Sequence, residues 1–386
     1  MEYLGIDSLE LIRLEGLHIA REITQQPELW RKVWDEVNRE QSDIQSFLNN
    51  ALTDSKKIIL TGAGTSAFIG FSLRGVFQRS TGIETEVIAT TDIVSHPKDY
   101  LLPNIPTLMV SFARSGNSPE SVAAVDIADE ICKTCYHLII TCNAEGKLAS
   151  HNYKSNHYIF TLPKEANDQS LAMTSSYSGM LLAGLLIGKI KELKTTRSSV
   201  DAIVSCANKI LGTRLKDLRG IAKIDFKRAV FLGAGPFYGT ATEAHLKLQE
   251  LTGGKVICKK DTYLGFRHGP KAVVDETTLI VYFLSSNEYV FQYEKDLIDS
   301  MKTGTRPIAE IGISESYLPD IAFTHSFEFS ETGKIIDEEF LPVCYILPAQ
   351  ILSFYKSLEL GLRPDSPSVN GAITRVVEGV QIYSLD

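Results

Sequence analysis

The sequence predicts an α/β protein made of two tandem, doubly wound parallel-sheet domains, each with three α/β/α layers, behind a helical N-terminal segment. Two observations support this prediction. Strand and helix patterns alternate along both halves of the chain, as they do where helices cover both faces of a parallel sheet. The halves also match at a constant shift of 171 residues, which places Gly62 on Gly233 and Thr81-Gly82 on Thr252-Gly253. Such a constant register indicates an internal duplication.

Residues 1–50 form the predicted helical segment. Apolar residues recur at helical spacing from Leu9 to Ile23, and Pro27 is expected to separate this helix from a second one that carries Trp30. No strand pattern occurs in this segment. We expect it to pack on a domain or on a partner subunit.

The first domain is predicted over residues 51–195 and the second over 196–365. In the first, strands are expected at 57–61, 86–88, 107–112, 138–141 and 157–162, and an apolar helix at 177–190 closes the domain. A charged segment without strand patterns, residues 191–223, leads to a first strand of the second domain at 228–232. Residues 366–386 are expected to form a tail that closes the active site.

Composition limits the classes of function. With 44% hydrophobic and 22% charged residues, the 386-residue chain is typical of a soluble globular protein. Its net charge of −8 provides no global attraction to nucleic acid. The longest apolar run, residues 180–188, is too short to cross a bilayer, and the N-terminus lacks a signal-peptide pattern. We therefore expect a cytoplasmic protein with neither nucleic acid nor a membrane as partner.

Six scattered cysteines include one C-x-x-C sequence, Cys132 to Cys135. A zinc site needs a second pair or histidines at ligand spacing, and neither is evident in the sequence. A redox dithiol is the alternative interpretation. We expect two unrelated, reduced thiols and no metal.

Two turns rich in glycine and hydroxyl groups open helices in the first domain: Gly62-Ala63-Gly64-Thr65-Ser66 and Ser115-Gly116-Asn117-Ser118. Helix N-termini present unpaired N–H groups and the positive end of the helix dipole, and the hydroxyls add hydrogen-bond donors. Capping of the helices would explain either turn alone. Two such turns after parallel strands of one domain favour a phosphomonoester site, to which Thr174-Ser175-Ser176 could add a third set of hydroxyls.

A charged helical face is predicted in the second domain, where Glu243, Lys247 and Glu250 stand at i, i+4 and i+7 after the strand at 228–232. A solvated surface held by ion pairs is the alternative interpretation. The duplication favours a functional role, because the equivalent positions of the first domain carry neither an acidic residue nor a lysine. We expect the first domain to hold the anion site and the second to hold the ionisable helix.

These motifs resemble those of the sugar isomerase (SIS) domain family in tandem, as in the isomerase half of glucosamine-6-phosphate synthase. The resemblance rests on the G-x-G-T-S turn at 62–66, the S-G-x-S loop at 115–118, the E-x-x-L-K-L-x-E helix at 243–250 and the H-G-P sequence at 268–270. Residues 167–176 and 263–270 are similar to those of AgaS-type galactosamine-6-phosphate deaminase/isomerases, long described as tagatose-6-phosphate ketose/aldose isomerases.

The resemblance implies roles for individual residues. Residues of the two turns would bind the 6-phosphate of the sugar: Gly64, Thr65, Ser66, Ser115, Gly116 and Ser118, with Ser175 as a further ligand. Glu250 would move the proton between C1 and C2, while Lys247 and Glu243 hold hydroxyls and tune Glu250. His268, supplied by a neighbouring subunit in the synthase, would open the pyranose ring, which implies a homodimer or higher homo-oligomer.

Four departures from the synthase bear on the reaction. Arg114 stands where the synthase has glutamine and becomes a candidate phosphate ligand, and Gly265 replaces an acidic residue three positions before the histidine. The synthase forms a Schiff base through a C-terminal lysine, but no lysine follows Lys356 in this chain, whose residues 371–375 occupy that region. The glutaminase domain is absent as well. The chain is therefore poorly suited to amination, and deamination is favoured.

We expect an enzyme that converts galactosamine 6-phosphate to tagatose 6-phosphate and ammonia without metal or organic cofactor. Simple aldose–ketose isomerisation of a hexose 6-phosphate remains an alternative, because both reactions share the proton transfer. A non-catalytic regulator that binds a sugar phosphate is the alternative from another class. Retention of the charged helix and His268 favours the enzyme, since binding alone does not require them.

Overall fold

The computed structural model describes residues 1–330, 336–368, 371, 373–377 and 379–385. The predicted tail at 366–386 therefore lies partly outside the described residues. The chain folds into two compact units. Unit 1 comprises Met1–Pro27, Gln169–Ala172 and Asp201–Asn370, and unit 2 comprises Glu28–Asp168, Met173–Val200 and Gly371–Asp386. No helix in the described parts of the chain is both long and apolar enough to cross a membrane.

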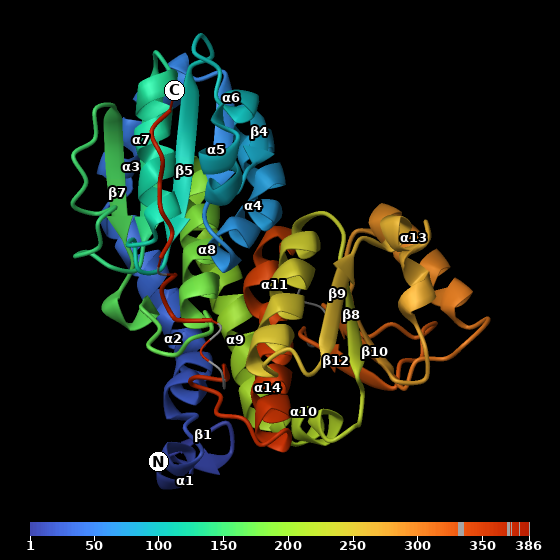
Figure 1. Ribbon diagram of the computed structural model, residues 1–386. Helices are drawn as coiled ribbons and strands as arrows, with labels where there is room; N and C mark the ends of the chain where they lie inside the picture. The colour runs from blue at the N-terminus through green and yellow to red at the C-terminus, as the bar shows by residue number, and fades with distance from the viewer. Residues whose placement is uncertain (331–335, 369–370, 372, 378, 386) are drawn as a thin grey trace. The chain divides into compact units, whose positions relative to one another are not determined.

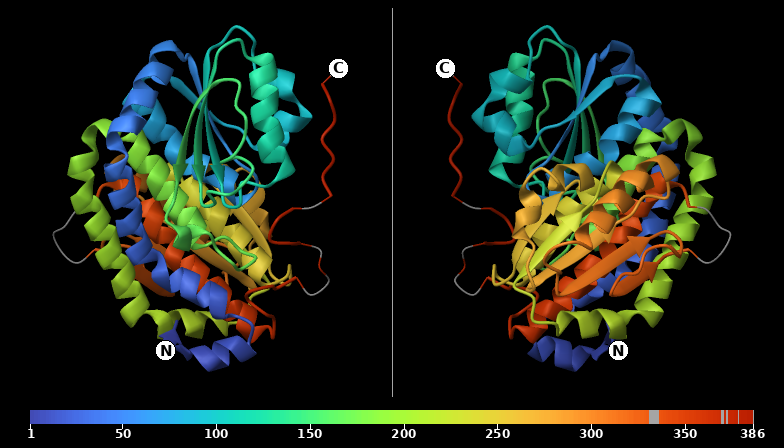
Figure 2. Two further views of the ribbon diagram at one scale, coloured as in Figure 1. Left: turned by 90° about the vertical axis from the view of Figure 1, so that its left-hand side faces the viewer. Right: turned by 90° about the vertical axis from the view of Figure 1, so that its right-hand side faces the viewer.

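Unit 2 is a three-layer α/β/α domain with a five-stranded parallel sheet in the order β4-β3-β5-β6-β7 (Figure 1). Its strands are β3 (Lys57–Thr61), β4 (Glu84–Val87), β5 (Thr107–Ala113), β6 (Cys135–Thr141) and β7 (Asn156–Thr161). Its helices are α3 (Gln41–Asp54), α4 (Thr65–Thr81), α5 (Thr90–Ser95), α6 (Pro97–Tyr100), α7 (Pro119–Ile131), η1 (Lys164–Ala166), α8 (Ser175–Gly188) and η2 (Ile190–Thr196). Helices α5 and α7 pack on one face and α4 and α8 on the other (Figure 2). The apolar side chains of the strands are buried on both faces, as expected of a covered parallel sheet.

Unit 1 contains a second five-stranded parallel sheet, in the order β9-β8-β10-β11-β12. Its strands are β8 (Arg228–Leu232), β9 (Ile257–Asp261), β10 (Thr278–Phe283), β11 (Ala309–Ser314) and β12 (His325–Glu328). Its helices after residue 200 are α10 (Leu215–Ala222), α11 (Pro236–Leu251), α12 (Tyr263–Phe266), η3 (Pro270–Val273), α13 (Glu288–Met301), η4 (Glu338–Phe340) and α14 (Leu341–Glu359), and α9 (Arg197–Thr213) leads into the unit. Helix α14 packs on α10 and α11, while α12 and α13 pack on the opposite side of the sheet.

The two sheets confirm the predicted fold and the duplication. The strand orders are equivalent, and β8 falls on β3 at the shift of 171 residues. The helix that follows each of these strands begins after a glycine of nearly the same conformation, φ 55° and ψ −127° at Gly64 and φ 53° and ψ −125° at Gly235. Glycine favours this positive φ, because a β-carbon disfavours it. At Gly62, a β-carbon would lie 2.7 Å from Ser66, so the turn needs glycine there as well.

The N-terminal segment differs from the prediction in two respects. Two antiparallel strands of two residues each, β1 (Glu2–Tyr3) and β2 (Ile6–Asp7), precede α1 (Ser8–Arg13); such short strands leave no alternating pattern. The expected helix break at Pro27 is wrong, because α2 runs without interruption from Leu17 to Arg39. A proline inside a helix costs about 3 kcal/mol, and burial of side chains after it, such as Trp30, offsets this cost. The Trp30 indole also donates to Ser178 Oγ at 3.0 Å.

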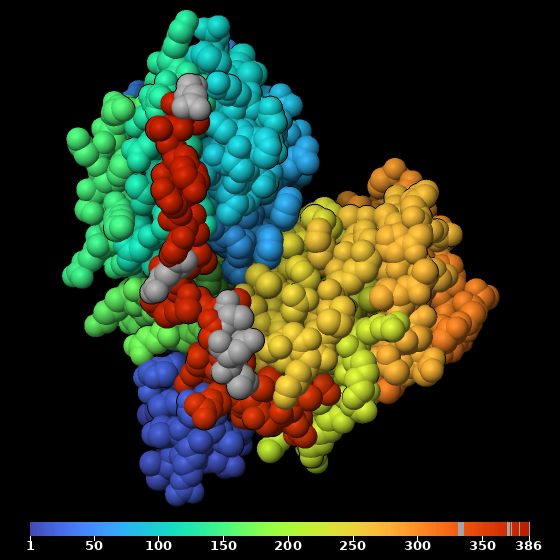
Figure 3. Space-filling view, viewed as in Figure 1, coloured from blue at the N-terminus to red at the C-terminus, as the bar shows by residue number. Residues whose placement is uncertain are grey.

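The described residues of the C-terminal tail from Gly371 onward belong to unit 2. Figure 3 shows them on the surface of that unit, and Leu385 packs against the core on the α5–α7 side. Arg375 holds the start of the tail, because its guanidinium donates to the carbonyl oxygen of Asp168 and, at 2.8 Å, to the side-chain oxygen of Asn167.

Candidate active site

The three charged residues of α11 form a compact ion cluster in unit 1. The ammonium of Lys247 lies 2.6 Å from Glu250 Oε2 and 3.3 Å from Glu243 Oε1. The side chains of Glu243 and Lys247 are 0% and 1% exposed, whereas that of Glu250 is 22% exposed. The alternative of a solvated surface face is therefore wrong. Burial of Glu243 and Lys247 leaves Glu250 as the carboxylate of the cluster that a ligand can reach.

The electrostatics of this cluster keep Lys247 charged. Burial alone would lower the pKa of Lys247, but the carboxylates of Glu243 and Glu250 outweigh it and hold the pKa above its usual value. Such a buried cluster is costly to assemble, and removing one charge leaves another uncompensated. The presence of this ion cluster in only one of the two domain copies is consistent with a chemical role.

The two predicted phosphate turns lie at the carboxyl ends of neighbouring strands of unit 2. Strand β3 ends at Thr61 and β5 at Ala113, and the two strands pair directly. Gly64 is the N-cap residue of α4, and Thr65 and Ser66 are the first residues of this helix. Counted along the unit, the strand order is 2-1-3-4-5, so the topological switch point lies between these two strands. The structure thus brings both turns to the edge where doubly wound sheets bind ligands.

The second turn is not explained by helix capping. Ser118 is the N-cap residue of α7, but its side chain makes no capping hydrogen bond. The turn itself is closed by Gly116, at φ 65°, and by the Ser115 hydroxyl, which accepts the N–H of Asn117 at 3.2 Å. The Ser118 hydroxyl is therefore not used by the helix that it precedes.

The equivalent loop of unit 1 holds a carboxylate. Ser286 falls on Ser115 at the shift of 171 residues, and its N–H donates to Glu338 Oε2 at 2.9 Å. The same oxygen accepts the N–H of Asn287 at 3.2 Å and the Ser285 hydroxyl. A loop of this type can therefore bind an oxyanion, and in unit 1 the chain supplies that oxyanion itself.

In unit 2 the residue equivalent to Glu338 carries no charge. The shift places Asn167 on Glu338, and the register holds there, because α8 and α14 end at the equivalent residues Gly188 and Glu359. The side-chain oxygen of Asn167 is bound by Arg375. The loop of unit 2 is therefore not neutralised by a carboxylate from this position, unlike its counterpart in unit 1.

The chain matches proteins of known family. The family model of the SIS domain matches residues 51–188. The D-galactosamine-6-phosphate deaminase AgaS of Shewanella sp. strain ANA-3 is 43% identical over 97% of this chain and 94% of its own length. This chain belongs to the AgaS family of SIS-domain proteins. The resemblance inferred from the sequence motifs is thereby confirmed.

Solved structures agree with this assignment to the AgaS family. The tagatose-6-phosphate ketose/aldose isomerase of Escherichia coli has a TM-score of 0.87 and 34% identity, over 96% of this chain and 98% of that one. A proposed isomerase of the same name from Clostridium novyi NT has a TM-score of 0.95 and 40% identity over the full length of both chains.

His268 of this AgaS-family chain lies in the loop between α12 and η3, where it is exposed. Its imidazole makes no hydrogen bond or ion pair with any described residue, Glu250 included. The structure therefore does not connect His268 to the ion cluster of α11. Its role in ring opening, and its action across a subunit boundary, stay predictions.

Ser175, the expected additional phosphate ligand, is fully buried. Its hydroxyl donates to Asp168 Oδ1 at 2.5 Å, and the other carboxylate oxygen accepts the N–H groups of Thr174 and Ser176 at 2.8 Å each. Asp168 thus caps the N-terminus of α8 and also accepts hydrogen bonds from the hydroxyls of Ser175 and Ser176. Contact of Ser175 with a substrate stays a prediction.

His245 was not predicted from the sequence, whereas Arg114 was predicted as a phosphate ligand and contacts a distant part of the chain. His245, on α11, is half-buried, and its Nδ1–H donates to the carbonyl oxygen of Thr242. Burial lowers the pKa of His245, which favours the neutral ring with Nε2 as an acceptor. In unit 2, Arg114 donates to the carbonyl oxygen of Arg375. A short motif could not reveal this contact, because the two arginines are far apart in the sequence.

Proposed function

We propose that this protein is an isomerising deaminase that converts galactosamine 6-phosphate and water to tagatose 6-phosphate and ammonia. The observation that carries the proposal is the cluster on α11, in which one partly exposed carboxylate, Glu250, lies 2.6 Å from a buried ammonium. The name of the Shewanella relative, a D-galactosamine-6-phosphate deaminase, supports the choice of substrate.

The cluster fits proton transfer next to a carbonyl group. Once the sugar ring is open, Glu250 removes the proton from C2, and the electrons form an enediol-like intermediate across C1 and C2. Return of the proton at C1 leaves a C2=N imine made from the substrate's own amine. Water adds to C2, the C–N bond breaks, and ammonia leaves, so the reaction is hydrolytic. These steps use no cofactor.

Lys247 supports this route as a cation and not as a nucleophile. A Schiff base requires a neutral amine, and the two flanking carboxylates raise the pKa of Lys247. As an ammonium, Lys247 can stabilise negative charge that develops on the intermediate. This distinguishes the proposed reaction from amination through an enzyme-bound imine.

The proposal assigns the 6-phosphate to the two turns of unit 2 and proton transfer to α11 of unit 1. The phosphate assignment is supported by the sister loop, which binds the carboxylate of Glu338 through the N–H groups of Ser286 and Asn287. In unit 2 the equivalent residue is the neutral Asn167, and the loop includes the cation Arg114. Ser66, Ser115 and Ser118 are the proposed side-chain ligands.

Simple aldose–ketose isomerisation is the second candidate, because the Escherichia coli protein of similar structure is named an isomerase. Both reactions use the same proton transfer but differ in whether an amine leaves from C2. A regulator that only binds sugar phosphates is less well supported, since recognition does not need a buried ion cluster beside an exposed carboxylate.

We further propose that the protein acts as a cytoplasmic homodimer. The exposed, unconnected imidazole of His268 supports a role for it in the site of a partner subunit. The absence of any disulfide among the six cysteines, all of which lie in the described chain, is consistent with a reducing compartment.

Ammonia release tests the proposal directly. The purified protein is supplied with galactosamine 6-phosphate, glucosamine 6-phosphate or tagatose 6-phosphate, and both ammonia and ketose are measured. We expect equal amounts of ammonia and tagatose 6-phosphate from the galacto substrate. Conversion of tagatose 6-phosphate to an aldose without turnover of either amino sugar would contradict deamination and favour the isomerase.

A further inference from the structure

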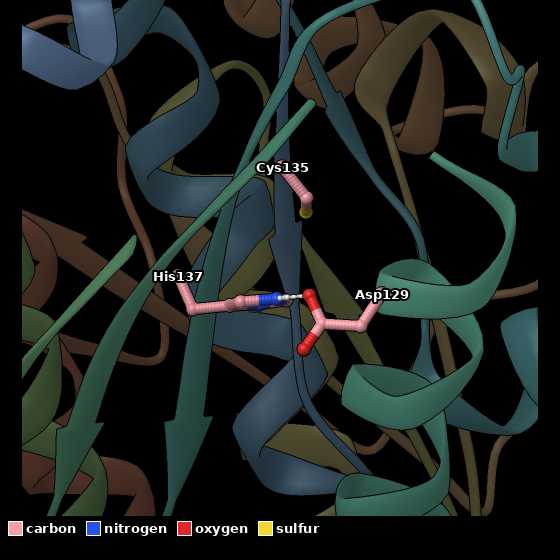
Figure 4. Close-up of side chains that lie close together, drawn as sticks. All are labelled: Asp129, Cys135 and His137. Atoms are coloured by element: carbon pink, nitrogen blue, oxygen red, sulfur yellow. Dashed lines mark hydrogen bonds and ion pairs between the residues drawn. The ribbon is translucent and has the colours of Figure 1, made fainter. Parts of the chain in front are cut away.

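A cluster of possible metal ligands lies in unit 2, outside the proposed active site. One ligand atom each of Asp129, Cys135 and His137 lies within 4.8 Å of the other two. Asp129 comes from α7, and Cys135 and His137 from β6 (Figure 4). The side chains of His137 and Asp129 are 0% and 2% exposed. Side chains of these types rarely meet in a protein interior unless they are paired or bind a ligand.

A second buried thiol stands three residues before Cys135. Cys132 follows the last residue of α7, is buried, and forms a C-x-x-C sequence with Cys135. Its burial and this spacing make Cys132 the candidate for a fourth ligand beside the carboxylate–imidazole pair.

We propose that Asp129, Cys132, Cys135 and His137 form a tetrahedral zinc site. Zinc is borderline-soft and binds cysteine sulfur, histidine nitrogen and carboxylate oxygen, usually as four ligands without water in a structural site. Metal–ligand distances of about 2.0–2.3 Å place neighbouring ligand atoms about 3.3–3.8 Å apart. The ligand atoms of Asp129, Cys135 and His137 already lie within 4.8 Å of one another, which is close to this spacing.

The surroundings of Asp129 fit this role. Its Oδ2 accepts the N–H of Lys154 at 3.0 Å, and its Oδ1 accepts the Ser155 hydroxyl at 2.5 Å. Such outer contacts orient a carboxylate ligand. They also connect the segment before β7 to α7, so a metal would tie this segment, α7 and β6 together.

Binding requires a defined exchange of protons. The imidazole Nε2 now lies 2.8 Å from Asp129 Oδ1, and Nδ1 is buried without a hydrogen-bond partner among the described residues. On metal binding, Nε2 becomes a ligand and the ring proton resides on Nδ1. Cys132 and Cys135 each lose a thiol proton, so one zinc ion replaces two protons. The energetic loss comprises the Asp129–His137 hydrogen bond and the burial of an Nδ1–H donor that has no partner among the described residues.

The position of the cluster indicates a structural role. Cys135 is the first residue of β6, whereas the proposed phosphate turns lie at the carboxyl ends of the strands. The length of β6 separates the two ends by about 20 Å, at about 3.3 Å per residue. The site would stabilise unit 2 without taking part in sugar chemistry. The competing interpretation is an Asp129–His137 ion pair beside two buried thiols that act as small apolar side chains.

Metal content and spectroscopy of the full-length reduced protein test the proposal. We expect one zinc per chain after purification without chelators. With cobalt(II) in place of zinc, we expect thiolate-to-cobalt charge-transfer absorption and the intense visible bands of a tetrahedral site. In Cys132→Ser, zinc affinity should fall by about 100-fold or more, because even outer-shell partners contribute about 10–100-fold.

Cys258→Ser is the matched control, since it removes a thiol from β9 of unit 1 and should change neither zinc content nor spectrum. Asp129→Asn serves as a second site variant that keeps the shape of the side chain if Cys132→Ser fails to fold, and it should likewise lower zinc affinity. A chelator should lower the melting temperature of the wild type but not that of Cys132→Ser. Reduced wild-type protein that binds no zinc, or equal zinc binding by wild type and Cys132→Ser, would overturn the proposal.

Discussion

Glu338 and Ser286 are joined by a hydrogen bond in which the Ser286 N–H donates to Glu338 Oε2 at 2.9 Å. The same carboxylate oxygen accepts the N–H of Asn287 and the Ser285 hydroxyl. Because Ser286 is the counterpart of Ser115 in the duplication, this bond shows what kind of group such a loop binds. Each domain copy contains a version of this loop. The loop of unit 1 binds the carboxylate of Glu338, and we propose that the loop of unit 2 binds the substrate.

The first prediction concerns Glu338 itself. In Glu338→Ala, the N–H groups and hydroxyls of residues 285–287 lose their acceptor, which should destabilise unit 1 by about 1–3 kcal/mol. Inorganic phosphate should recover part of this loss by binding in the vacated loop. The measurement is the melting temperature against phosphate concentration at constant ionic strength. An equal phosphate effect in wild type and variant would contradict the prediction, because Glu338 occupies this loop in the wild type and the loop is vacant only in the variant.

The fold was largely predictable because the repeat and the strand patterns are local. Strand β8 matches the predicted strand at 228–232, and the two N-cap glycines have the same backbone conformation. The continuity of α2 through Pro27 could not be predicted from local rules. Proline penalises the helix locally, and the compensation comes from side chains such as Trp30 that are buried against distant residues.

The candidate site was predictable in its residue types but not in its burial. Helical spacing places Glu243, Lys247 and Glu250 on one face, yet only tertiary packing determines that Glu243 and Lys247 are covered. The contact of Glu338 with Ser286 and the approach of Asp129 to Cys135 and His137 likewise depend on tertiary structure. Sequence spacing could not reveal them.

A second prediction tests Glu250 as the base. Glu250→Gln retains the size of the side chain but cannot accept a proton, so kcat should fall by about 100- to 10,000-fold with little change in substrate affinity. The measurements are steady-state ammonia release and calorimetric binding. Glu276→Gln, an exposed residue of unit 1, is the control and should behave as wild type. Near-normal turnover of Glu250→Gln would exclude Glu250 as the base.

A third prediction tests the phosphate assignment. Ser115→Ala removes one hydrogen-bond donor to a charged ligand, which should weaken the free energy of substrate binding by about 1.5–3 kcal/mol. KM should therefore rise by about 10- to 100-fold, while kcat changes less. Ser95→Ala, at the exposed end of α5, is the control in the same unit. The kinetics should be measured with galactosamine 6-phosphate and with unphosphorylated galactosamine. An unchanged KM for the phosphorylated sugar would contradict the assignment.

A fourth prediction tests the role of His268 across subunits. Glu250→Gln and His268→Gln chains, each with its own affinity tag, are co-expressed and the mixed dimer is purified through both tags. If each site takes Glu250 from one chain and His268 from the other, one of the two sites is intact, and about half of the wild-type activity per dimer should return. Dimers with the same substitution in both chains are the controls. A mixed dimer without activity would place both residues of a site in one chain.

The last prediction concerns the pH dependence of stability through Glu294, a buried residue of α13 whose Oε2 accepts the N–H of Ser285 at 2.9 Å. Burial raises its pKa from 4.5 to about 8, and the nearby Glu338 adds to the rise. Between these two values the unfolded chain binds fewer protons than the folded one, so stability falls as pH rises. Glu294→Gln should flatten this fall between about pH 5 and pH 8, as measured by urea unfolding across that range. Glu288→Gln, an exposed residue at the start of the same helix, should keep the wild-type slope. The same slope in wild type and Glu294→Gln would show that Glu294 is not protonated in the folded state.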